Sequence, residues 1–100
     1  MDSTYILDGH TPVQCPDVEE WAKWFGENKF KRHVADEKIG DVRVSTVFLG
    51  VDHSFGDGPP VLFETMVFGG PLDEETDRCS TWDQAEQMHA EMVDRVKHAK

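Results

Sequence analysis

Two short groups of acid and histidine stand where predicted strands end, and they carry the side chains best suited to chemistry. Asp8 and His10 follow the first predicted strand, and Asp52 and His53 follow the third. Carboxylates and imidazoles are ligands that zinc, manganese or iron accept, and histidine also serves as a general base near neutral pH. If the two strands are neighbours, the four residues converge and predict a metal-dependent enzyme.

The alternative interpretation of these residues is local. Asp-Gly and Asp-His pairs are typical of turns in which the carboxylate hydrogen-bonds nearby backbone. The spacings H-x-E and H-E-x-x-H, which would strengthen a metal site, are absent from the sequence. We therefore favour turns here, and we predict neither a cofactor nor a catalytic residue.

Basic residues gather once along the chain, around an aromatic side chain. Lys29, Lys31 and Arg32 enclose Phe30. Cations beside an aromatic face are a common way to hold nucleotides. The cluster predicts a small anion or nucleotide site, and its alternative is the solvated end of a strand that balances local acids.

The charge of the chain is strongly negative and unevenly distributed. The sequence has 20 acidic and 10 basic residues, a net charge of −10. Residues 1–50 hold nine acids and six bases, net −3, and residues 51–100 hold eleven and four, net −7. Such a chain does not bind nucleic acid through a general basic surface. Its acidic side favours a basic partner, because opposite potentials accelerate encounter.

A protein-binding surface is predicted from the acidic run and from two aromatic residues. The run is Asp73, Glu74, Glu75 and Asp77, which we expect in solvent. Trp24 lies just beyond the apolar stripe of its helix, and Phe55 lies in a loop, so each is a candidate exposed anchor of the kind that dominates interfaces. Trp24 alternatively widens the core face of the helix.

Glu64 lies in the middle of a predicted strand and shares a face with Leu62 and Met66. A carboxylate on a core face is a candidate site residue. The alternative is a half-covered face, on which Glu64 meets water or a basic partner such as Arg43.

The elements that must position these residues begin with strands. Pleated-surface residues and turn signals predict strands over 4–7, 33–39, 42–51 and 61–68, with a short edge strand at 78–79. Two prolines predict a loop over 11–16. The 100 residues suffice for one domain, and no apolar run is long enough to cross a membrane.

Two helices are predicted from caps and periodicity. Asp17 and Glu20 form a capping pair before a stripe of Val18, Trp21, Ala22 and Phe25. Thr81 and Gln84 form a second such pair, before a helix that ends at about residue 96. The order β-α-β-β-β-(β)-α predicts an α+β two-layer sandwich, with an antiparallel sheet of three to five strands and both helices on one face. A curled, partly barrel-like sheet is the alternative.

Several strings in the sequence carry a resemblance to a known family. They are Tyr5–Val13, Trp21–Phe25, Val44–His53, Leu62–Gly70 and the helix start at Ser80-Thr81-Trp82. The chain resembles small proteins encoded by tailed phages and by prophages in bacterial genomes, a family that supplies no catalytic residues to carry over. The resemblance implies a phage accessory protein in the bacterial cytoplasm, and the absence of a signal peptide agrees with that compartment.

Four functions follow as hypotheses. The first is non-catalytic binding that inhibits a bacterial host factor, such as a defence complex, through a basic surface on that factor. The second is a small-ligand module that sequesters a signal nucleotide, completed in a homo-oligomer. The third is the metal-dependent enzyme described above, and the fourth is a structural part of the virion. None of the four requires a membrane.

Overall fold

Four strands form one antiparallel sheet in the computed structural model, which describes residues 3–54 and 56–99. Their order in the sheet is their order in the chain: β3 (His33–Ile39), β4 (Val42–Phe48), β5 (Phe63–Phe68) and β6 (Thr76–Cys79). The bounds of β3 are those predicted, while β4 and β5 are shorter than predicted because the chain leaves the sheet around the long loop that joins them. The antiparallel α+β class is therefore confirmed.

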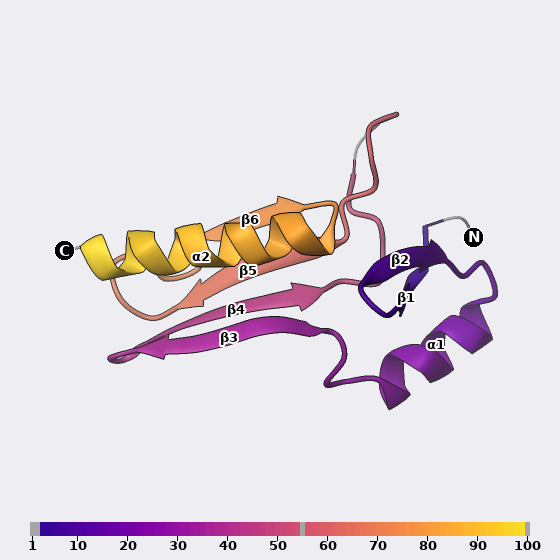
Figure 1. The fold of residues 1–100 in the computed structure, drawn as a ribbon, viewed down its shortest axis with the longest axis horizontal. Coiled ribbons are helices and arrows are strands. Elements are labelled where there is room, and N and C mark those ends of the chain that lie inside the picture. The colour runs from indigo at the N-terminus through magenta and orange to yellow at the C-terminus, as the bar shows by residue number, and fades with distance from the viewer. Residues whose placement is uncertain (1–2, 55, 100) are drawn as a thin grey trace.

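The helix α2 (Trp82–His98) covers one face of this sheet (Figure 1). Thr81 and Gln84 form the predicted capping box at its start. The face beneath it alternates along the strands, as a pleated sheet requires: Val44, Thr46 and Phe48 of β4 lie beside Val67, Thr65 and Phe63 of β5, and all six are buried. Met92 and Val93 of α2 pack there, so this layer is the main core.

The N-terminal segment is a second, smaller sheet. β1 (Tyr5–Asp8) pairs with β2 (Thr11–Gln14), with Gly9 and His10 as the turn. The prediction of a loop over 11–16 is wrong at this point, because Pro12 lies in a two-stranded edge where a missing N–H donor is tolerated. Gly9 has φ +63°, which favours glycine in so tight a turn.

The helix α1 (Val18–Glu27) packs against β1 and does not lie beside α2 on the large sheet (Figure 1). The arrangement therefore differs from the predicted one, in which both helices cover one face of a single sheet. Trp21 fixes it by donating from Nε1 to the carbonyl oxygens of Tyr5 and Gly50, each at 3.1 Å. Gly50 has to be glycine, since a Cβ there would lie 2.7 Å from the ring of Phe25.

The predicted stripe of α1 is only half correct. Trp21 and Phe25 face inward, but Val18 is 50% exposed and Ala22 is exposed. Trp24 takes part in the packing instead, because the helix meets a narrow hairpin and the end of β4 rather than a broad sheet. Neither helix is long and apolar enough to span a membrane within residues 3–54 and 56–99.

Candidate functional site: a cleft between the hairpin and the sheet

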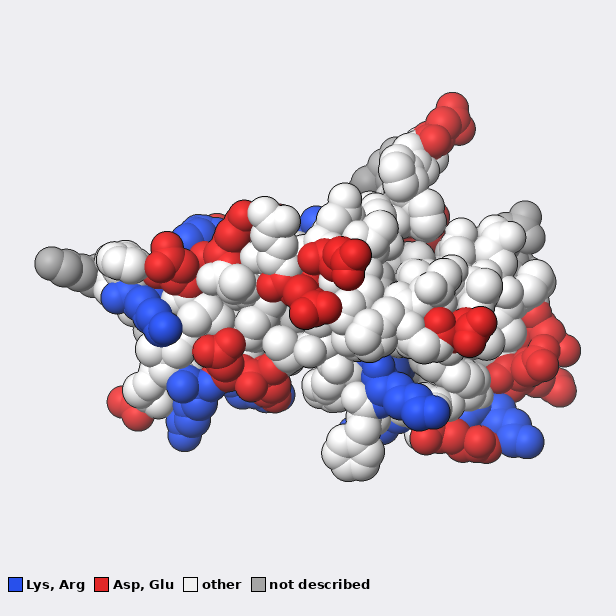
Figure 2. Space-filling model, viewed as in Figure 1, with Lys and Arg blue, Asp and Glu red and all other residues white. Residues whose placement is uncertain are grey.

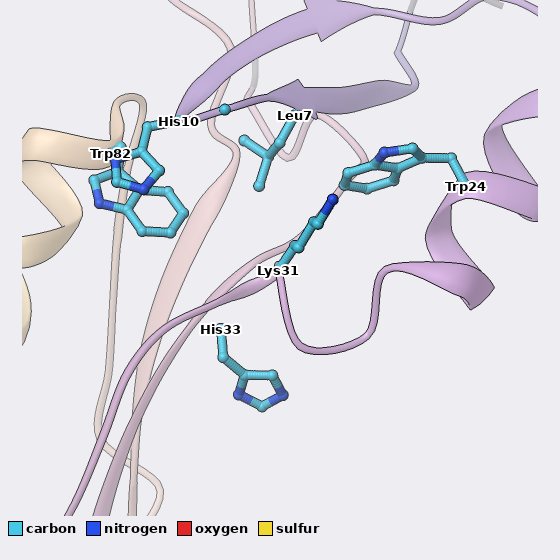
Figure 3. Close-up of a pocket in the computed structure, with 7 residues that line it drawn as sticks. Leu7, His10, Trp24, Lys31, His33 and Trp82 are labelled. Atoms are coloured by element: carbon cyan, nitrogen blue, oxygen red, sulfur yellow. The ribbon is translucent and has the colours of Figure 1, made fainter.

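A cleft of about 430 Å³ opens where the hairpin, α1, β3 and α2 meet. Figure 3 shows Trp24 on one side of it and the rings of His10 and Trp82 on the other, with Leu7 between them. Lys31 extends toward Trp24 from the turn before β3. Gly9 and His33 complete the lining. The volume lies within the usual range of small-ligand sites.

The two aromatic walls of the cleft are joined through the core. Trp24 meets Phe48 edge to face, with ring centres 6.1 Å apart, and Trp82 meets Phe63 in the same way at 6.1 Å. Phe48 and Phe63 lie side by side at 5.4 Å and are almost fully buried. The separation of the walls is therefore set by close-packed side chains rather than by flexible loops.

His10 completes one wall by stacking on Trp82. The ring centres are 3.8 Å apart and the planes differ by 6°. His10 sits at the turn of the hairpin and Trp82 is the first residue of α2, so the stack also ties the small sheet to the large one. Stacking of this kind is beyond the reach of sequence patterns, because the two residues are 72 positions apart.

The lining of the cleft is cationic or neutral, in contrast to the rest of the chain. Of its seven residues, all within the part of the chain that the structure describes, Lys31 carries a positive charge and none is acidic. Acids make up 20 of the 100 residues, and none of them lies in this lining. The arrangement can hold a flat ring against indole or imidazole faces and a negative group at Lys31.

The predicted basic cluster is divided by the structure. Lys31 lines the cleft, and Lys29 is exposed outside its lining. Phe30 is 90% exposed. Arg32 turns the other way and stacks on Phe25, with its guanidinium carbon 3.6 Å from the ring centre, and burial there lowers the pKa of Arg32. Of the seven lining residues, the sequence patterns single out His10, Trp24 and Lys31 and assign no site role to Leu7, Gly9, His33 and Trp82.

The acid–histidine groups do not converge. The N–H of Asp52 bonds the carbonyl of Ser3 at 2.8 Å, at one end of the hairpin, whereas Asp8 ends β1. Five extended residues separate those ends by about 16 Å. Residues 3–54 and 56–99 hold no cluster of three or more ligand side chains that could bind a metal. The hypothesis of a metal site at Asp8, His10, Asp52 and His53 is therefore wrong.

Asp52 has the local role that its turn signal indicates. Its Oδ1 accepts from the N–H groups of Ser54 and Val61, each at 2.8 Å, and these bonds hold the pKa of the carboxyl below its ordinary value. The backbone of His53 also holds the two ends of this loop together, because its N–H donates to the carbonyl of Val61 at 2.9 Å. Asp52 thereby closes the long loop between β4 and β5.

Acidic side chains gather over α2 and the adjoining loops in the view of Figure 2. The run Asp73, Glu74, Glu75 and Asp77 is exposed, as predicted. Part of it is used within the fold: Asp73 accepts from the N–H of Gly69 at 2.6 Å, and Glu75 pairs with Arg95 at 3.1 Å. Phe55, the second predicted anchor, lies outside the described residues.

Trp24 lies on the core side of its helix, and Glu64 lies on a half-covered face with a basic partner, which are the alternatives given for each. Trp24 widens the core face of α1 and lines the cleft, so it does not stand out as an exposed anchor. Glu64 lies on the face of the sheet opposite α2 and pairs with Arg78 at 2.9 Å rather than with Arg43.

A buried polar network under α2 escaped the sequence patterns. His89 is 4% exposed, and its Nδ1 lies 2.7 Å from the hydroxyl of Thr46, which lies 2.5 Å from that of Thr65. Its Nε2 lies 3.2 Å from a carboxylate oxygen of Glu37 on β3. Both threonines are fully buried, so no substrate reaches their hydroxyls, and the network joins helix to sheet.

The two cysteines are both free thiols. Cys15 is buried and Cys79 is partly buried, and burial raises the pKa of each. Raised values leave little thiolate at neutral pH, so neither thiol is an activated nucleophile.

Comparison of the chain with protein-family models, with curated proteins and with solved structures finds no match.

Proposed function

We propose that this protein is a binding module whose cleft takes a small ligand with a flat aromatic ring and a negative group, the chemistry of a nucleotide. The observation that carries the proposal is the lining: two aromatic walls and one lysine, without an acid, in a chain of net charge −10. Ring stacking supplies affinity that tolerates the identity of the base, and Lys31 supplies the anion contact.

Preorganisation supports the same proposal. Trp24 and Trp82 are held by Phe48 and Phe63 in the core, so they need little ordering when a ligand enters. Rigid walls lower the entropic cost of binding. The repulsion between a negative ligand and the negative chain is opposed locally by the positive charge of Lys31.

A panel of related ligands tests the proposal by thermal shift. The panel contains one nucleoside, its mono-, di- and triphosphates, and inorganic phosphate. A ligand that binds only the native state raises the melting temperature, so the nucleotides should stabilise the protein more than the nucleoside or phosphate alone. Equal melting temperatures throughout the panel would remove this function.

A second candidate function is binding to a basic surface of a bacterial host protein, which inhibits that protein. The observation in its favour is the acidic side of the molecule, where α2 adds exposed acids to the run at 73–77: Asp83, Glu86, Glu91 and Asp94. The negative electrostatic potential over α2 attracts a positively charged surface and accelerates its association. The resemblance to phage proteins agrees with a target of this kind.

Charge reversal separates the two functions. The variant with Asp83→Lys, Glu86→Lys and Glu91→Lys should abolish low-salt capture of a host protein on the immobilised chain and leave nucleotide binding in place. Lys31→Glu should do the opposite. If the triple variant still captures the same protein at low salt, the acidic surface is not the binding surface.

A further inference from the structure

The face of the large sheet opposite α2 has no helix over it among residues 3–54 and 56–99. The register places Ser45, Val47, Met66 and Phe68 on that face, because each alternates with residues that contact α2. Phe68 is 43% exposed, and Val47 and Met66 are partly exposed. α1 packs against β1 instead of closing this side.

The charges on this open face differ from those on the rest of the chain. Its ionisable residues other than histidine are Lys38, Arg43, Arg78, Asp36 and Glu64, which sum to +1. The whole chain carries −10, so the remaining surface sums to −11. Two copies that meet through any acidic side repel each other, whereas the open faces meet without that penalty.

Four of the five charged residues of the open face form two ion pairs around its apolar centre. Arg43 binds Asp36 at 2.7 Å and lies over the ring of Phe68 at 5.6 Å, and Arg78 binds Glu64 at 2.9 Å. Because these ion pairs are complete within each copy, covering the face leaves none of their charges buried without a partner. Apolar residues inside a paired polar rim are the usual anatomy of an interface.

We propose that the open face binds a second copy of this chain, sheet against sheet. A two-fold axis places the same mixed-charge surface on both sides, so each copy presents both signs to its partner. Aligned packing of the two sheets about 10 Å apart would bring Val47, Met66 and Phe68 into one apolar layer.

The face is small for an interface. Its strands have seven, seven, six and four residues and cover about 380 Å², a little less than half of what a standard interface buries on each partner. Interfaces of this size are typical of weak, transient association, so we expect the dimer only at high protein concentration.

Sedimentation equilibrium between about 5 and 500 μM tests the proposal. The mass should rise from 11.4 kDa toward twice that value, and added salt should strengthen association because it screens the repulsion between two negative copies. A mass of one chain at every concentration and salt level would overturn the proposal.

Two phenylalanine variants locate the interface. Phe68→Ser should keep the chain monomeric at 500 μM, while Phe30→Ser should dimerise as the parent does, although Phe30 is the more exposed ring at 90%. Circular dichroism of each variant confirms that it is folded. Loss of the dimer in Phe30→Ser alone would place the contact elsewhere and contradict the proposal.

Discussion

The two helices of this protein differ in how much of their surface they bury, and this difference explains where a ligand can bind. α2 buries five residues against the large sheet, and one of them, His89, is hydrogen-bonded to Glu37 of β3 and to Thr46 of β4. α1 buries no residue fully and is held by one tryptophan and by ring contacts at the end of the sheet. α2 and the large sheet supply stability. The cleft between α1 and α2 presents the aromatic faces that a ligand would contact.

Breaking the core that both regions share should have the largest effect. Phe48→Ala removes a buried ring that contacts Trp24 and Phe63, and such truncations cost about 3–5 kcal/mol. Urea denaturation should show a much lower midpoint, and the cleft should be lost with the wall contact. Val18→Ala on α1 is the control and should change the free energy of unfolding by less than about 0.5 kcal/mol.

The buried network should have the next largest effect. His89→Ala leaves the hydroxyl of Thr46 without its imidazole partner and leaves a cavity, for a loss of about 2–3 kcal/mol in urea denaturation. Lys97→Ala, an exposed change on the same helix, is its control. If His89→Ala were as stable as the parent, the network would not join helix to sheet.

The two helix caps give a direct comparison of the regions. Thr81→Ala removes the capping box of α2 and should cost about 1 kcal/mol of global stability. Asp17→Ala removes the cap of α1, whose side chain accepts from the N–H groups of Glu19 and Glu20. Because α1 is lightly packed, hydrogen exchange should show local fraying there with a smaller change in global unfolding. Equal losses in the free energy of global unfolding would mean that the two helices are packed equally firmly in the fold.

The smallest expected effect is that of pH on the loop bound by Asp52. Its folded pKa lies below the ordinary value of about 3.9, so its contribution to stability is present above that value and is lost as pH falls through the folded pKa. Asp52→Asn should be less stable than the parent at pH 7, and the difference should shrink near pH 3. A constant difference across this range would show that the carboxylate charge is not what closes the loop.

The parts of the fold that sequence predicts are those set by local chemistry. The box of Thr81 and Gln84 and the turn bond between Asp52 and Ser54 depend on neighbours within a few residues, and the bounds of β3 follow from its turn signals. The position of α1 and the stack of His10 on Trp82 depend on contacts between distant segments. The cleft depends on such distant contacts and therefore could not be predicted, although the sequence indicates Lys31 and Trp24 as candidate binding residues from their chemical type.

Tryptophan fluorescence tests the central claim that the cleft binds an anionic aromatic ligand. Two of the three indoles, Trp24 and Trp82, line the cleft, and Trp21 is bonded to the backbone of Tyr5 and Gly50, so quenching of the unaltered chain by a nucleoside triphosphate reports binding in the cleft. We expect saturable quenching that Lys31→Glu weakens tenfold or more, about 1.4 kcal/mol, whereas Lys29→Glu weakens it only slightly. Absence of quenching, or equal weakening by the two variants, would contradict the account.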